Sequence, residues 1–222
     1  MSGLLLVCFL LLSRQAAQVS GSMKIQEDNR KVIAVDPGHG GADPGMVGVS
    51  GLEEKGINLE IAGKLERVLT DKGYHVVMTR KEDQGLYDSS APNKKSQDMQ
   101  RRIAFLEKAS PVLTVSIHQN SYSDPGIKGP QVFYYETSRE GKRLAQEVQE
   151  SMNRKLLPER PREIKGNTSY YLLKRSKGTL IIVECGFLTN PEEAALLQKE
   201  EYQQKVAEAV ADGIESYLSS RK

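Results

Sequence analysis

The sequence has 222 residues, enough for one domain of ordinary size or two small ones. Hydrophobic residues make up 38% and charged residues 27%, which is the balance of a globular protein and excludes a disordered or fibrous one. Because 31 Lys and Arg nearly cancel 29 Asp and Glu, the net charge of +2 gives no electrostatic reason to expect binding to nucleic acid or to an anionic membrane.

The chain begins with an apolar run that is typical of an export signal. Residues 4–12 read LLLVCFLLL, which is far shorter than the ~20 residues that a membrane-spanning helix needs. Small and polar residues follow up to Gly21, as a signal-peptide cleavage site requires. We therefore expect residues 1–21 to be a signal peptide or an N-terminal anchor, and the protein to be extracytoplasmic, with no membrane span beyond that leader. Outside the leader Cys185 is the only thiol, which excludes a disulfide within the mature chain.

The rest of the chain alternates predicted strands with predicted helices. Short apolar runs bounded by turn residues predict strands over 31–35, 74–79, 112–117, 131–135, 170–173 and 180–183. Apolar residues at helical spacing predict helices around 57–69, 98–108, 144–152 and 206–218. A further helix is predicted to start at Asn190, since Pro and Glu follow it at the favoured positions. This alternation predicts a single α/β domain over 31–218, with a largely parallel central sheet of about six strands flanked by helices.

Three side chains that can bind a metal or move a proton follow predicted strands. His39 follows the first strand, His118 the third and Glu184 the last. Ligands of open α/β sheets bind beyond the carboxyl ends of the strands, so parallel strands would bring all three side chains to one edge. Two imidazoles and one carboxylate, with water in the fourth position, suit zinc. Spacing alone does not choose the carboxylate, for which the candidates are Asp36, Asp43, Glu53, Glu54 and Glu184. The third histidine, His75, lies at the start of a predicted strand and is assigned no role.

The glycine-rich loop after the first strand is a poor candidate for a nucleotide site. Residues 38–43 nearly match the pattern G-x-G-x-x-G, but Asp43 stands where the third Gly should be. Its carboxylate would repel a pyrophosphate, and the P-loop pattern is missing from the sequence. We therefore expect no nucleotide cofactor.

Four motifs in chain order resemble those of the zinc-dependent N-acetylmuramoyl-L-alanine amidases, the group often called Amidase_3. These motifs are Val35–Gly41 with Asp43–Gly45, Gly51–Leu59, Ser116–Asn120 and Val183–Asn190. The resemblance implies that His39, Glu54 and His118 bind Zn²⁺ and that Glu184 is catalytic. Residues 129–135 and 170–173 are similar to a narrower subgroup, the amidases with which endospore formers prepare cortex peptidoglycan for muramic-δ-lactam.

This resemblance implies a peptidoglycan hydrolase that acts on muramyl peptides. The expected reaction is hydrolysis of the amide between N-acetylmuramic acid and L-alanine of the stem peptide, in the cell wall or in the intermembrane space of the developing spore. Little sequence follows Leu218 to form a separate wall-binding module, so we expect an activating protein partner. Two other functions stay open: a zinc peptidase that acts within the stem peptide, and a non-catalytic homologue that binds the cell wall.

Overall fold

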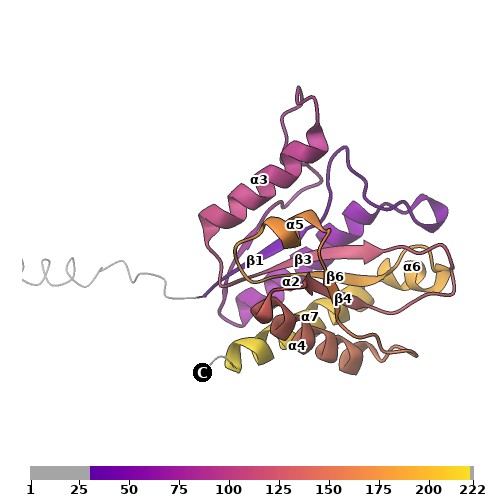
Figure 1. The fold of residues 1–222 in the computed structure, drawn as a ribbon. Coiled ribbons are helices and arrows are strands. Elements are labelled where there is room, and N and C mark those ends of the chain that lie inside the picture. Colours follow the sequence, from indigo (N-terminus) through magenta and orange to yellow (C-terminus); the bar gives the residue numbers. More distant parts are fainter. Residues whose placement is uncertain (1–30, 221–222) are drawn as a thin grey trace, which may run out of the picture. The chain divides into compact units, whose positions relative to one another are not determined.

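A six-stranded sheet forms the centre of the residues that the computed structural model describes, 31–220 (Figure 1). Its strand order is β2-β1-β3-β6-β4-β5. The strands are β1 (Val32–Pro37), β2 (His75–Met78), β3 (Leu113–Asn120), β4 (Gln131–Tyr135), β5 (Lys165–Asn167) and β6 (Leu180–Phe187). The first four strands in that order run parallel to one another, whereas β4 runs antiparallel to β6 and parallel to β5. The prediction of an α/β domain with a largely parallel sheet is confirmed. The predicted leader, residues 1–21, lies outside the described residues.

Helices cover both faces of the sheet (Figure 1). Three pack on one face and contribute to the larger apolar core: α2 (Glu54–Asp71), α4 (Arg139–Leu156) and α7 (Glu200–Ser219). Two lie on the other face, over the smaller core: α3 (Lys94–Ala109) and α5 (Tyr171–Arg175). The helix predicted to start at Asn190 is α6 (Pro191–Leu197), and the Asn190 side chain accepts a hydrogen bond from the Glu193 backbone. A short 3₁₀ turn, Val49–Gly51, precedes α2.

The predicted strand over 170–173 is wrong. Leu172 and Leu173 are both buried in the smaller core, and two adjacent residues can share one side in a helix but not in a strand. The sixth strand of the sheet is instead β5, which pairs only with β4. With the sequence Lys-Gly-Asn, β5 lacks the apolar alternation by which a strand is recognised.

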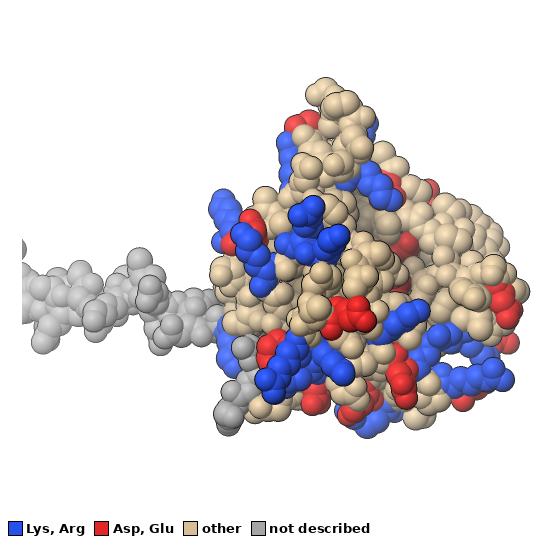
Figure 2. Space-filling model, in the orientation of Figure 1, with Lys and Arg blue, Asp and Glu red and all other residues tan. Residues whose placement is uncertain are grey.

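Successive side chains of a strand point to opposite faces of the sheet, so Glu184 and Cys185, which are neighbours on β6, have different surroundings. Cys185 is fully buried in the larger core, as a free thiol facing away from Glu184. On the face shown in Figure 2, Lys and Arg lie among Asp and Glu. No helix within residues 31–220 has the length and apolar character needed to cross a membrane.

Candidate metal centre

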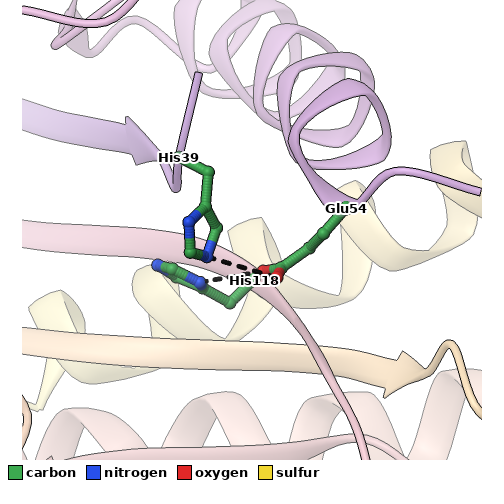
Figure 3. A group of neighbouring side chains, drawn as sticks. All are labelled: His39, Glu54 and His118. Atoms are coloured by element: carbon green, nitrogen blue, oxygen red, sulfur yellow. Dashed lines mark hydrogen bonds and ion pairs between the residues drawn. The ribbon is translucent and has the colours of Figure 1, made fainter. Parts of the chain in front are cut away.

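His39, Glu54 and His118 meet at the carboxyl edge of the parallel strands (Figure 3). His39 lies in the loop after β1, Glu54 is the first residue of α2, and His118 lies near the end of β3. The two imidazole rings are 5.0 Å apart between centroids. His39 Nε2 is 3.2 Å from Glu54 Oε2, and His118 Nδ1 is 3.0 Å from Glu54 Oε1. One possible ligand atom from each residue lies within 4.8 Å of the others, so the three form a site that fits a divalent cation.

The other carboxylates that the sequence left open have different partners. Glu53 is exposed and pairs with Lys55 at 3.3 Å. Asp43 Oδ2 lies 3.0 Å from His39 Nδ1, the ring nitrogen that does not face Glu54. A carboxylate in this position orients an imidazole and raises its basicity as a ligand. Sequence reasoning missed this role for Asp43, although its place four residues after His39 in a tight loop was a usable signal.

The loop that carries His39 depends on close backbone approach. His39 itself has a φ of 61°, in the left-handed region. A Cβ atom at Gly38 would collide with the His118 ring, so only glycine lets the loop pass over that imidazole. Arg80 donates hydrogen bonds to the carbonyl oxygens of Pro37 and Gly38 at 3.0 and 2.9 Å. The backbone conformation of this loop, supported by Arg80, therefore brings His39 close to His118.

A buried ion-pair network supports this loop from the face of α3. Arg102, 1% exposed, pairs with Asp36 at 2.6 Å and with Asp98 at 2.6 Å. It also donates to the carbonyl oxygens of Pro37 and His39. Burial alone would raise the pKa of Asp36, but the Arg102 charge and hydrogen bonds from neighbouring hydroxyls lower it to about 2. Asp36 thus forms a buried ion pair with Arg102 and is not one of the three residues of the candidate metal cluster.

Replacing Asp36 with Asn is expected to lower the free energy of unfolding by roughly 3 kcal/mol at pH 7, because Arg102 would lose one of its two buried carboxylate partners. The folded-state pKa of Asp36 lies below its ordinary value of 3.8, so this stabilisation is present above pH 4 and is lost as the pH falls towards 2. Urea unfolding of the metal-free protein between pH 3 and 7 measures both effects. Asp88→Asn is the matched control, since Asp88 pairs with the neighbouring Arg101 in solvent. An equal loss in that variant would contradict the argument.

Glu184 faces the two histidines from the neighbouring strand. His118 and Glu184 are paired residues of β3 and β6, and both line a cavity of about 400 Å³ at the sheet edge. Glu184 is 6% exposed, and its Oε2 has no hydrogen-bond partner among the described residues. Burial raises the pKa of Glu184 to about 7, where the negative charge of Glu54 adds to the shift and His118 opposes it. Glu184 is thus a buried carboxyl group with a raised pKa, and it lies beside the three candidate ligands.

The charge of Glu54 is set by its neighbours. Burial alone would raise the pKa of this carboxyl, but hydrogen bonds and charge from His118 and His39 hold the pKa well below its usual range. The same contact raises the pKa of His118 against the opposing effect of burial. Glu54 is therefore ionised, as a metal ligand must be. His75, in contrast, is exposed at the start of β2 and is not part of this cluster.

Helices α3 and α5 both contribute side chains to the cavity that contains the three candidate ligands. Lys95 and Met99 come from α3, and Tyr171 and Leu172 come from α5, with Tyr170 just before it. Its lining combines a cation, aromatic rings and apolar side chains around the three candidate ligands. Such a mixed cleft suits an amphiphilic substrate better than a purely apolar one.

The fold and the site together define the class: an α/β domain with a largely parallel sheet, whose carboxyl edge carries two imidazoles and a carboxylate that could hold a metal ion, beside the buried Glu184. The particular family follows from comparison with known proteins. Residues 33–216 match the model of the N-acetylmuramoyl-L-alanine amidase family, Amidase_3, and the chain belongs to that family.

Relatives and solved structures agree with this assignment. The germination-specific N-acetylmuramoyl-L-alanine amidase of Bacillus subtilis is 34% identical over 194 residues, which cover 86% of this chain and 81% of that protein. The structure of the CwlD amidase from Clostridioides difficile in complex with the GerS lipoprotein is 35% identical with a TM-score of 0.83, covering 86% of this chain and all of that one. The amidase AmiC2 of Nostoc punctiforme is 32% identical with a TM-score of 0.74, covering 85% and 97%. The chain thus has the fold of amidases and is a hydrolase of their family.

Proposed function

We propose that this protein is a zinc-dependent amidase that hydrolyses the bond between the lactyl group of N-acetylmuramic acid and L-alanine of the stem peptide. The observation that carries the proposal is the convergence of His39, Glu54 and His118 within 4.8 Å, beside the buried Glu184. Membership of the amidase family supports the substrate. We place the catalytic domain at 31–218 and propose an exported protein, in line with the leader expected over 1–21.

The donor set of the cluster fits zinc. His39, Glu54 and His118 would supply two imidazole nitrogens and one carboxylate oxygen, a combination that catalytic zinc sites use. Bound there, zinc would polarise the amide carbonyl and lower the pKa of a water molecule towards ~7. With its carboxylate 3.0 Å from His39 Nδ1, Asp43 would hold the His39 ring in the tautomer that presents Nε2 to the site.

Glu184 has the position and the environment of the proton carrier. An amide has a poor leaving group, because the amine must be protonated as the C–N bond breaks. The Glu184 carboxylate would accept the proton of the attacking water and return it to the leaving L-alanine nitrogen. The unpartnered Oε2 and the pKa near neutral support this role, since the group is ready to accept one proton and then release it.

The biological setting is proposed from the relatives. The first relative is germination-specific and another is an amidase seen in complex with a lipoprotein. We therefore place this protein among the cortex amidases of endospore formers, acting in the cell wall or the intermembrane space of the developing spore. An activating protein partner fits the same setting.

Mass spectrometry of products from defined muramyl peptides tests the proposed reaction. We expect two products, the free muramic acid derivative and a stem peptide whose L-alanine has a free amine, and we expect a chelator to stop their formation. A zinc peptidase would instead give fragments cut within the stem peptide. A wall-binding homologue without catalysis would give no products with or without zinc. Either of these two results would contradict the proposal.

A further inference from the structure

Two buried amide side chains, Asn58 and Gln119, adjoin the Glu54 carboxylate. Asn58 lies one helical turn after Glu54 on α2, and its Nδ2 donates to Glu54 Oε1 at 3.0 Å and to the Gly38 carbonyl oxygen at 3.2 Å. Gln119 donates from Nε2 to Asn58 Oδ1 at 3.1 Å, and from its backbone N–H to Glu54 Oε1 at 3.0 Å. Asn58 is fully buried and Gln119 is 4% exposed. The two amides thus form a short chain of hydrogen bonds that ends on the candidate metal ligand.

The hydrogen-bond pattern fixes the orientation of both amides. Asn58 faces two acceptors, the Glu54 carboxylate and the Gly38 carbonyl, so its NH₂ group must point towards them. Its Oδ1 then points to Gln119 and needs a donor, which within residues 31–220 is the Gln119 NH₂ group. Reversing either amide would bring two acceptors together. Gln119 therefore secures the orientation in which Asn58 donates to Glu54.

This arrangement leaves Gln119 Oε1 buried with no hydrogen-bond partner among the described residues. An unpaired buried acceptor destabilises a folded protein, and Leu or Met of similar size would avoid the penalty. Stability of the core alone therefore does not explain a glutamine at this position. The Cys185 thiol also lies beside this side chain, but the amide hydrogen bond of Gln119 goes to Asn58, which points to a role at the metal centre.

The amide pair connects all three segments that carry the candidate ligands. Gly38 precedes His39 in the loop after β1, Glu54 begins α2, and Gln119 follows His118 on β3. Side chains from distant segments bind a metal well only when their supporting contacts hold them in place beforehand. Asn58 touches the first two segments directly and the third through Gln119.

We propose that Asn58 and Gln119 are positioning residues, which hold Glu54 and the two histidine segments in the ligand geometry and thereby set the affinity of the site for a divalent cation. This inference rests on the proposed function, because it takes His39, Glu54 and His118 as the metal ligands.

Zinc affinity of Gln119→Leu and Asn58→Leu, measured by competition with a chromogenic chelator, tests the inference. We expect Gln119→Leu to bind zinc about 10-fold more weakly, and Asn58→Leu roughly 10- to 100-fold more weakly, as for other groups that orient a ligand. The double variant should bind no more weakly than Asn58→Leu alone, since Gln119 acts through Asn58. The d–d absorption bands of the cobalt-substituted protein should shift in Gln119→Leu, because the ligand geometry changes.

Gln149→Leu is the matched control. Gln149 is also a buried glutamine, 2% exposed, but it lies on α4 and its amide bonds to the backbone of Val132 and Pro130. We expect this variant to lower the free energy of unfolding while it keeps wild-type zinc affinity and cobalt bands. An equal loss of zinc affinity in Gln149→Leu would show a general effect of a weakened core and overturn the inference. Unchanged zinc affinity in Gln119→Leu would also overturn it.

A parallel measurement on His39→Ala separates this inference from the proposed function. If His39→Ala loses zinc while Gln119→Leu binds it normally, the ligand set holds and the positioning role fails. If His39→Ala binds zinc normally, the ligand set itself is wrong, and the inference fails with it.

Discussion

Glu184→Gln is expected to lower the rate of amide hydrolysis by about 10²- to 10⁴-fold, while zinc content stays at the wild-type level. Glutamine has nearly the shape of glutamate but cannot accept the proton of water and return it to the leaving amine. Glu184 also lies outside the three-residue cluster whose atoms approach one another within 4.8 Å, so its loss should leave metal binding intact. Turnover of a defined muramyl peptide and zinc analysis of the same sample measure the two quantities.

The same substitution should stabilise the metal-free protein at alkaline pH. Burial raises the pKa of Glu184 from 4.5 to about 7, so the folded protein holds this proton more tightly than the unfolded chain does. Folding stability therefore falls as the pH rises between these two values, by about 3 kcal/mol in total. The substituted glutamine side chain would carry no charge and avoid that loss. Urea unfolding of the metal-free proteins at pH 5 and pH 8.5 should show a gain for the variant at the higher pH alone.

Glu193→Gln controls for the effect of altering a buried glutamate. Glu193 is 8% exposed and accepts hydrogen bonds from the backbone of Phe187 and Gly129, outside the metal centre. We expect this variant to retain most of the wild-type turnover. Loss of zinc together with activity in Glu184→Gln would identify Glu184 as a ligand and contradict its assignment as proton carrier.

The fold could be predicted wherever hydrophobic periodicity determined the local structure. The runs that became β1, β3 and β6 are apolar because these strands are covered on both faces, and such strands are recognisable from sequence. The pair Leu172 and Leu173 was ambiguous, because a short apolar run suits a buried strand or one turn of helix equally well. The edge strand β5 carries no apolar signal, since its pairing to β4 is made by backbone hydrogen bonds.

The residues that meet at the candidate site could be predicted from the sequence, but their supporting contacts could not. His118 and Glu184 each follow a predicted strand, and the carboxyl ends of parallel strands lie at one edge of the sheet. In the structure these two residues are paired between β3 and β6. The contacts of Arg102 with the loop, and of Gln119 with Asn58, join residues more than sixty positions apart. Such pairs follow from the packing of α2 and α3 on the sheet, which no local pattern specifies.

His118→Ala and His39→Ala are each expected to abolish zinc binding, with a loss greater than the roughly 10- to 100-fold that follows from changing an orienting residue. Each variant removes one of the three proposed ligand atoms, so the remaining pair would hold zinc too weakly to survive dialysis against a chelator. Hydrolysis should disappear with the metal, and excess zinc should restore little of it.

The third histidine of the chain, His75, is a control for this experiment, because it lies outside the candidate metal centre. His75 lies exposed at the start of β2, and His75→Ala should keep wild-type zinc content. Metal binding should also order the variants by mechanism: the ligand substitutions lose most, Asn58→Leu and Gln119→Leu lose less, and Glu184→Gln loses none. A ligand variant that binds zinc as tightly as His75→Ala would refute the proposed ligand set. Zinc loss in Glu184→Gln equal to that in His118→Ala would move Glu184 into the ligand set, and the proton carrier would then have to be another residue.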